Sequence, residues 1–155
     1  MDRRSATWGR RFVILSIATV MATALAACGG GGGGGGGKTT LDVTLQEFSV
    51  IPAQDSVSSG DVTFKTSNKG PKDVHELVVI KTDLDPDQLP TEADGSVNEE
   101  ASGLEGIGEV EDVEVGQTKT FTVHLDPGHY VMICNIVDKV GAHYRDGMRT
   151  ALTVD

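Results

Sequence analysis

The stretch that decides the fold of this chain is PGHYVMICNIVDKVGAHYRDGM, from Pro127 to Met148. It opens with a Pro-Gly turn signal and continues into Tyr130 to Ile136, a run typical of a β-strand. Cys134 lies within that run, and His143 and Met148 follow it. A thiolate, an imidazole and a thioether therefore occur within 15 residues, between two expected strands.

The rest of the folded part also has the signature of short strands. Most of its apolar segments alternate with polar residues at period two, and Gly, Pro and Asn turns separate them. No segment beyond the first 27 residues has a sustained apolar period of 3.6 residues. The sequence predicts an all-β domain, an antiparallel Greek-key β-sandwich. The expected strands are Leu41–Leu45, Asp61–Thr66, Val74–Ile80, Lys119–Leu125, Tyr130–Ile136 and Arg149–Val154.

One long stretch interrupts the strand pattern. Thr82 to Gln117 contains twelve acidic residues and no Lys or Arg. We expect a long acidic loop insertion between two strands, with a short helix near Pro86 to Leu89. The simplest interpretation is a solvated acidic face, and docking of a partner through these charges is the alternative.

The N-terminus has the order of an export signal. Basic residues precede an uncharged apolar stretch, Phe12 to Ala27, which is shorter than the roughly 20 residues of a membrane-spanning helix. Leu25-Ala26-Ala27-Cys28 resembles the lipobox of bacterial lipoproteins, in which the cysteine is diacylated. We predict a lipoprotein signal peptide over 1–27 and an extracytoplasmic protein that Cys28 anchors to the cell membrane by its lipid. A plain membrane anchor with an incidental cysteine is the alternative.

Nine consecutive glycines, Gly29 to Gly37, follow the lipobox. Such a tract has no side chains to bury and behaves as a flexible coil. We therefore assign residues 28–37 to the lipidated cysteine and its linker, and residues 38–155 to one folded domain. About 118 residues are enough for a single domain with its own core.

The charge and the cysteines narrow the function further. Without the leader the chain has nine basic and 22 acidic residues, a net charge of about −13. This excess argues against nucleic-acid binding and favours a partner with a basic docking patch. Cys134 is then the one thiol left in an oxidising compartment. Such a cysteine is buried and inert, paired between chains, or bound to a metal.

A second imidazole completes a familiar set of metal ligands. His75 lies at the start of the expected strand Val74–Ile80. Two histidines and a cysteine, with a weaker axial methionine, form the ligand set of blue-copper sites. Thiolate and thioether are soft donors that suit Cu(I), and imidazole serves both oxidation states of copper. His124, on the expected solvent face of its strand, and His129, beside a turn, are left outside the site.

These motifs resemble the cupredoxin family over about 60 residues. The resemblance covers Gly60-Asp61-Val62-Thr63-Phe64 through Asn68 and Gly70 to His75, and then Pro127-Gly128-His129-Tyr130 to Met148. It implies one copper ion in a type 1-like site. The implied ligands are His75, Cys134, His143 and, on the axis, Met148. It also implies that His143 lies at the solvent-facing end, where electrons would enter.

The sequence departs from the family at two places. Eight residues separate Cys134 from His143, where the family usually has two to four. They could bulge outward and leave the ligands in place, or widen and expose the site. Glu76 occupies the position at which many cupredoxins have an Asn that braces the copper loop and tunes the metal.

The function expected from the sequence is that of an electron carrier, not an enzyme. A membrane-tethered copper protein would shuttle single electrons between redox proteins of the cell envelope. Two alternatives remain open at this point. One is a copper-binding module for sequestration or delivery, and the other is a metal-free cupredoxin-like interaction domain.

Overall fold

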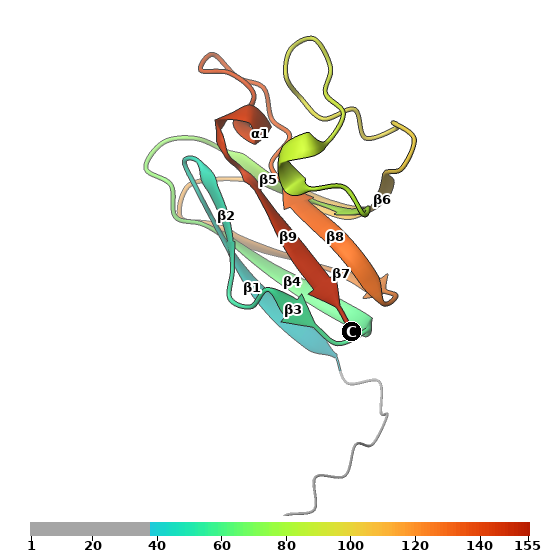
Figure 1. Ribbon diagram of the computed structural model, residues 1–155. Coiled ribbons are helices and arrows are strands. Elements are labelled where there is room, and N and C mark those ends of the chain that lie inside the picture. Colours follow the sequence, from blue (N-terminus) through green and yellow to red (C-terminus); the bar gives the residue numbers. More distant parts are fainter. Residues whose placement is uncertain (1–37) are drawn as a thin grey trace, which may run out of the picture. The chain divides into compact units, whose positions relative to one another are not determined.

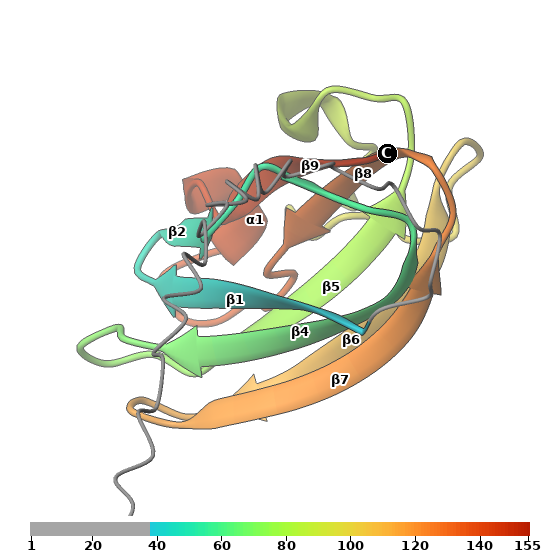
Figure 2. The same ribbon diagram turned by 90° about the horizontal axis from the view of Figure 1, so that it is seen from below.

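The computed structural model describes residues 38–155, which form a sandwich of two β-sheets (Figure 1). The two layers face each other when the molecule is seen from below (Figure 2). The predicted signal peptide, the lipidated Cys28 and the glycine linker lie outside the described residues. Within residues 38–155, no helix has the length and apolar character needed to cross a membrane.

Each sheet contains strands from distant parts of the chain. The first has the order β2-β1-β4-β7 and the second the order β3-β9-β8-β5-β6. The strands of the first sheet are β1 (Thr39–Gln46), β2 (Ser49–Pro52), β4 (Gly60–Asn68) and β7 (Thr118–Leu125). Those of the second are β3 (Ser56–Val57), β5 (His75–Lys81), β6 (Glu105–Val113), β8 (Gly128–Ile133) and β9 (Arg149–Val154). Two helical turns complete the fold, η1 (Pro86–Gln88) and α1 (His143–Asp146).

The all-β prediction is confirmed, but the sheets are mixed and not purely antiparallel. β1 pairs with β4 in parallel, and β3 pairs with β9 in parallel. Parallel neighbours need a crossover connection, because a tight hairpin reverses the strand direction. Here the chain leaves β1 through β2, crosses to the second sheet as β3, and returns beside β1 as β4. Strands of four and two residues are too short to show a period, so the sequence did not predict β2 or β3.

The expected acidic loop is partly a strand. β6 lies within Thr82–Gln117 and pairs antiparallel with β5 at the edge of the second sheet. Its apolar residues lose the regular period of two because the register shifts twice along the pair. The segment is also rich in acidic residues and glycines, which strands disfavour, and the sequence therefore predicted a loop here. The expected short helix is confirmed as η1.

The core fills the space between the sheets and continues into the ligand region. Phe64 of β4 is fully buried, and its ring stacks on Phe121 of β7 at 5.1 Å. Cys134 and Met148 belong to the same buried cluster. Two of the predicted metal ligands are therefore part of the packed hydrophobic core.

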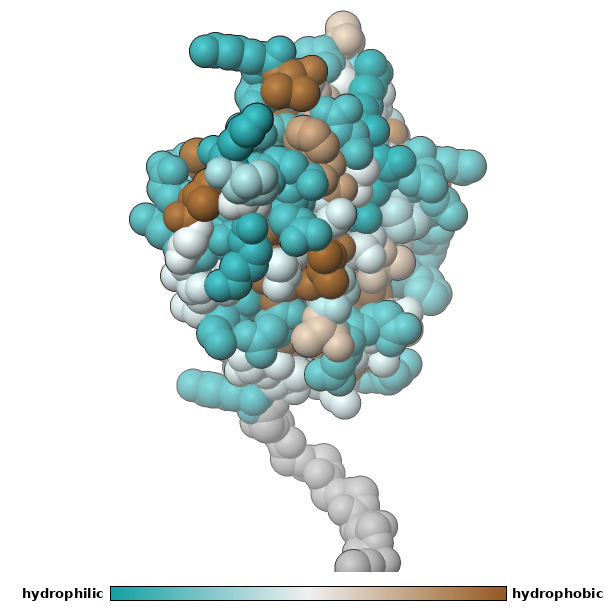
Figure 3. Space-filling view, turned by 90° about the vertical axis from the view of Figure 1, so that its left-hand side faces the viewer, coloured by the Kyte–Doolittle hydropathy of each residue, from teal (hydrophilic) through white to brown (hydrophobic). Residues whose placement is uncertain are grey.

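Few large apolar side chains of residues 38–155 are exposed. Figure 3 shows one face on which polar residues surround separate hydrophobic patches. Within residues 38–155 the exposed large apolar side chains come from different elements and loops, and single exposed apolar residues are normal on a protein surface. They are Ile51, Leu84, Val115, Val137 and Val140.

Candidate metal centre

Antiparallel pairing brings the predicted ligands to one end of the second sheet. β5 and β8 run antiparallel, with Val78 opposite Ile133. His75, the first residue of β5, therefore lies near Cys134, which directly follows β8. His143 begins α1, which leads the chain back towards β9.

Three donor atoms converge in this corner. The Nδ1 atoms of His75 and His143 are 3.2 Å apart, and they lie 3.9 and 3.4 Å from Sγ of Cys134. The point equidistant from the three atoms is about 2.0 Å from each. Bonds from a metal ion to imidazole nitrogen or thiolate are about 2.0–2.3 Å long. The triangle therefore fits a metal ion, and within residues 38–155 it is the one such cluster of His, Cys, Asp and Glu side chains.

Burial and the backbone hold these donors in place. All three side chains are fully buried. The backbone N–H of Cys134 donates to the carbonyl of Met148 at 3.0 Å, and that of Met148 donates to the carbonyl of His143 at 3.0 Å. Met148 is thus tied to two of the three donor residues and is itself fully buried. Its role as an axial ligand stays a prediction.

The apolar surroundings set the protonation of the site. Burial raises the pKa of the Cys134 thiol to about 11, against a smaller lowering by the backbone N–H groups of Glu76 and Ile136. Burial, followed by the charge of His143, lowers the pKa of His75. A metal ion binds thiolate and neutral imidazole, so binding here would release the thiol proton.

Comparison with known proteins decides the fold. No family model matches the chain, and no curated protein sequence matches it. The reduced auracyanin of the photosynthetic bacterium Roseiflexus castenholzii is similar, with a TM-score of 0.54 and 21% identity over 77% of this chain and 99% of that one. Auracyanin A of Chloroflexus aurantiacus, described as a "blue" copper protein, has a TM-score of 0.52 and 17% identity over 77% and 100%. A rusticyanin variant has a TM-score of 0.51 and 16% identity over 77% and 79%.

The chain has the cupredoxin fold.

The long loop of this domain bulges outward and leaves the donors together. Val137 and Ala142 form an isolated antiparallel bridge, and the backbone N–H of His143 donates to the carbonyl of Ile136 at 2.9 Å. Asp138 closes the tip of the loop by accepting from the backbone N–H groups of two residues further along. The eight residues therefore form a closed turn and do not pull the site apart.

The same loop overturns the expected exposure of His143. Its side chain is fully buried instead of facing solvent. The physical reason is that Asp138, from the extra residues, lies against the outer edge of the ring, with Oδ2 3.6 Å from Nε2. Phe48 packs on the ring from the other sheet's β1–β2 connection, at 5.4 Å between centroids.

Glu76 braces the loop in a way the sequence did not predict. Its carboxylate accepts from the backbone N–H of Asn135 at 2.9 Å, and its own backbone N–H donates to Sγ of Cys134 at 3.4 Å. Burial, together with the nearby Glu109 and Glu99, raises the pKa of Glu76 to about 7. A carboxylate that accepts a hydrogen bond thus ties the loop to β5 where many cupredoxins have an amide.

Sequence reasoning missed two acidic residues beside the donors. Glu47 follows β1, and Asp138 lies in the long loop. Glu47 is distant from the ligand stretch in the sequence, and a lone acidic residue in a turn carries no signal of its own. The hydrogen bonds that Asp138 makes within the turn were detectable only as a general preference of Asp for such positions.

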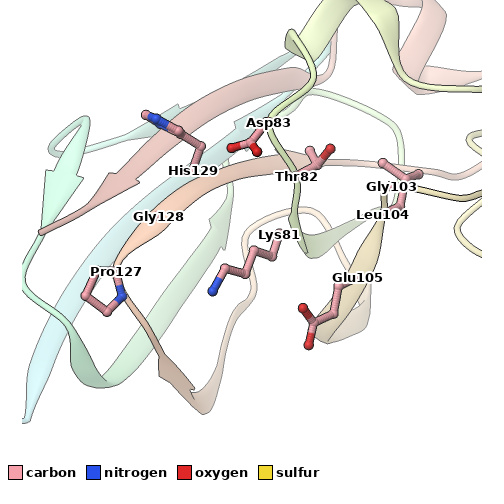
Figure 4. A pocket seen from close by; sticks show the side chains of 9 residues that line it. All are labelled: Lys81, Thr82, Asp83, Gly103, Leu104, Glu105, Pro127, Gly128 and His129. Atoms are coloured by element: carbon pink, nitrogen blue, oxygen red, sulfur yellow. The ribbon is translucent and has the colours of Figure 1, made fainter.

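The two histidines left out of the predicted site lie away from the three donors. His124 is exposed and pairs with Asp61 at 3.0 Å. His129 lines an open hollow at the opposite end of the second sheet, with Lys81 and Glu105 (Figure 4). Their side chains point in different directions, so this hollow gathers no set of converging ligands.

Proposed function

We propose that this protein binds one copper ion in a type 1-like site and carries single electrons. The observation that carries the proposal is the triangle of two Nδ1 atoms and one Sγ atom, formed by His75, His143 and Cys134. This donor set, with the axial thioether of Met148, is that of blue-copper electron-transfer sites. The similar auracyanin A is described as a "blue" copper protein, which supports the choice of metal.

The surroundings of the site favour a carrier over a catalyst. When bound, copper supplies a one-electron couple. The donor side chains are fully buried, and the backbones of Cys134 and His143 are each hydrogen-bonded to that of Met148, so the site has a rigid frame that changes little between oxidation states. A catalytic metal site keeps an open position for substrate. Four ligands in a buried corner provide none.

The closed loop also bears on the alternative of copper delivery. A site that hands over its metal needs an accessible ligand. His143, the ligand nearest the surface in related sites, is fully buried here, with Asp138 of the loop and Phe48 against its ring. The burial of this ring favours retention of the ion.

We further propose that the carrier works at the outer face of a cell membrane. The support is in the sequence alone: the lipobox at Cys28 and the glycine tract that follows it. The acidic excess of the chain suits redox partners with a basic docking patch. Electron exchange with a small cationic oxidant should then slow as salt is added, whereas exchange with an anionic oxidant should speed up.

The proposal is tested by titrating the purified protein with Cu(II). We expect one equivalent to bind, an intense visible thiolate-to-copper band, and a reversible one-electron wave in voltammetry. Cys134→Ser should abolish the band. Cys28→Ser, which removes the other cysteine of the chain, is the matched control and should keep it.

Each alternative gives a different result. Stoichiometric binding without reversible electron transfer would indicate copper handling. An absence of copper binding would indicate a metal-free domain. An unchanged band in Cys134→Ser would refute the proposed ligand set.

A further inference from the structure

In each histidine of the site, the Nε2 atom lies near a carboxylate. Nε2 of His143 lies 3.6 Å from Oδ2 of Asp138, and Nε2 of His75 lies 3.8 Å from Oε1 of Glu47. Both rings are fully buried, and neither Nε2 atom has a hydrogen-bond partner among residues 38–155. Two carboxylates therefore stand next to two unpartnered ring nitrogens.

Metal ligation through Nδ1 would give these carboxylates a role as hydrogen-bond acceptors. A neutral imidazole carries one N–H and one lone pair. If Nδ1 of each ring faces the metal, the proton of each ring must reside on Nε2. A buried N–H needs an acceptor, because it has lost its contact with water. The carboxylates are about half an ångström outside the usual hydrogen-bond range, so a small shift of ring or carboxylate makes the bond.

Asp138 is preorganised for this contact. Its Oδ1 accepts from the backbone N–H groups of Val140 at 2.7 Å and Gly141 at 3.2 Å, which leaves Oδ2 free to face His143. Glu47 is also held by the backbone, but there one oxygen does both: the Oε1 that faces His75 accepts from the backbone N–H groups of Lys72 and Asp73. The acceptors are therefore fixed by the fold before any metal binds.

We propose that Asp138 is a positioning residue that holds His143 in the Nε2–H tautomer, with Nδ1 directed at the metal. Glu47 has the matching position at His75. The inference rests on the proposed copper function and gives the eight-residue loop a role. The loop replaces solvent at His143 with a fixed carboxylate, which raises the basicity of the ligand and favours Cu(II) over Cu(I).

Asp138→Asn is the decisive variant. The amide oxygen can keep the two hydrogen bonds of the turn, but its NH₂ group then replaces Oδ2 and faces the N–H of His143. Asp138→Ser keeps a turn acceptor and removes Oδ2 altogether, so it serves if the first variant does not fold. Asp146→Asn is the matched control, because no hydrogen bond or ion pair of the described residues involves the Asp146 carboxylate.

Two measurements on the whole protein test the inference. The first is Cu(II) affinity by competition with a chelator, and the second is ¹⁵N NMR of the Cu(I) form with exchange of the His143 Nε2 proton. We expect Asp138→Asn and Asp138→Ser to weaken Cu(II) binding about 10- to 100-fold, the usual effect of losing such a partner. Cu(I) binding should weaken less, and the Nε2 proton should exchange faster. The control should match the parent protein in both measurements.

The outcomes separate this inference from the proposed function. If the parent protein binds copper and the Asp138 variants keep its affinity and proton exchange, the positioning role is refuted and the copper function stands. If the parent protein takes up no copper, both fail.

Discussion

The carboxylate of Glu76 accepts a hydrogen bond from the backbone N–H of Asn135 at 2.9 Å. The two residues are 59 positions apart, and each directly follows a predicted copper ligand, His75 or Cys134. One hydrogen bond therefore ties the start of β5 to the beginning of the long loop. Asn135 extends the link, because its amide donates to Oε1 of Glu99 at 2.7 Å and accepts from the backbone N–H of Val97.

Glu76→Ala should destabilise the copper-free protein more than Glu76→Gln. Alanine leaves the N–H of Asn135 without its acceptor, at a cost of about 1–3 kcal/mol in the free energy of unfolding. Glutamine keeps an acceptor oxygen at the same place, so its effect should stay below about 1 kcal/mol. Urea denaturation measures both values. Equal effects of the two substitutions would contradict a bracing role for this hydrogen bond.

Met148→Leu should change the reduction potential more than copper binding. The axial thioether is a weak, long ligand that tunes the potential, whereas the two imidazoles and the thiolate hold the ion. Leucine has a similar volume, so the buried site should lose less than about 1.5 kcal/mol of stability. Voltammetry and a copper titration give the comparison. His143→Ala is the contrasting variant and should strongly alter the visible band. A potential that stays the same in Met148→Leu would argue against the axial role.

Phe64→Ala should test the core that supports the site. The side chain is fully buried and stacks on Phe121, so its loss should cost about 3–5 kcal/mol in the free energy of unfolding. Val140→Ala is the control, because Val140 is 67% exposed and should change stability by less than about 0.5 kcal/mol. Chemical denaturation of the copper-free protein separates this effect from metal binding. Similar midpoints for the two variants would be inconsistent with the packing.

Glu109→Gln should make stability less dependent on pH. Partial burial raises the pKa of Glu109 on β6, and the charges of Glu111 and Glu99 raise it further. A raised pKa means that the folded state binds the proton more tightly than the unfolded state does. The stability from this proton is present below the ordinary pKa and is lost as pH rises through the raised value.

The stability of the variant relative to that of the parent protein should therefore increase from acid to neutral pH. Because Glu109 is only slightly buried, the gain in stability should stay below about 1 kcal/mol. Thermal unfolding midpoints at pH 4 and pH 8 measure it. Glu92→Gln controls for the loss of one exposed acid, because no ion pair of the described residues involves Glu92. A gain that is equal at both pH values would contradict the assignment to Glu109.

The sequence by itself determined the class of fold and the types of ligand. Strand periodicity and turn residues are local properties, so the alternation in Lys119–Leu125 and the Pro-Gly turn before Tyr130 could be read without knowledge of packing. The donor chemistry of Cys134, His143 and Met148 is also a property of the residues themselves. These features led to an all-β sandwich and to a resemblance with cupredoxins, and the fold is confirmed.

Only the tertiary structure decided how the site is closed. The convergence of His75 with His143 spans 68 positions and depends on the pairing of β5 with β8. The burial of His143 and the approach of Asp138 depend on the path of the long loop. A loop path is set by contacts with the surrounding fold, and no local pattern encodes those contacts. The partner of Glu76 likewise follows only from the pairing of β5 with β8, which brings Asn135 beside it.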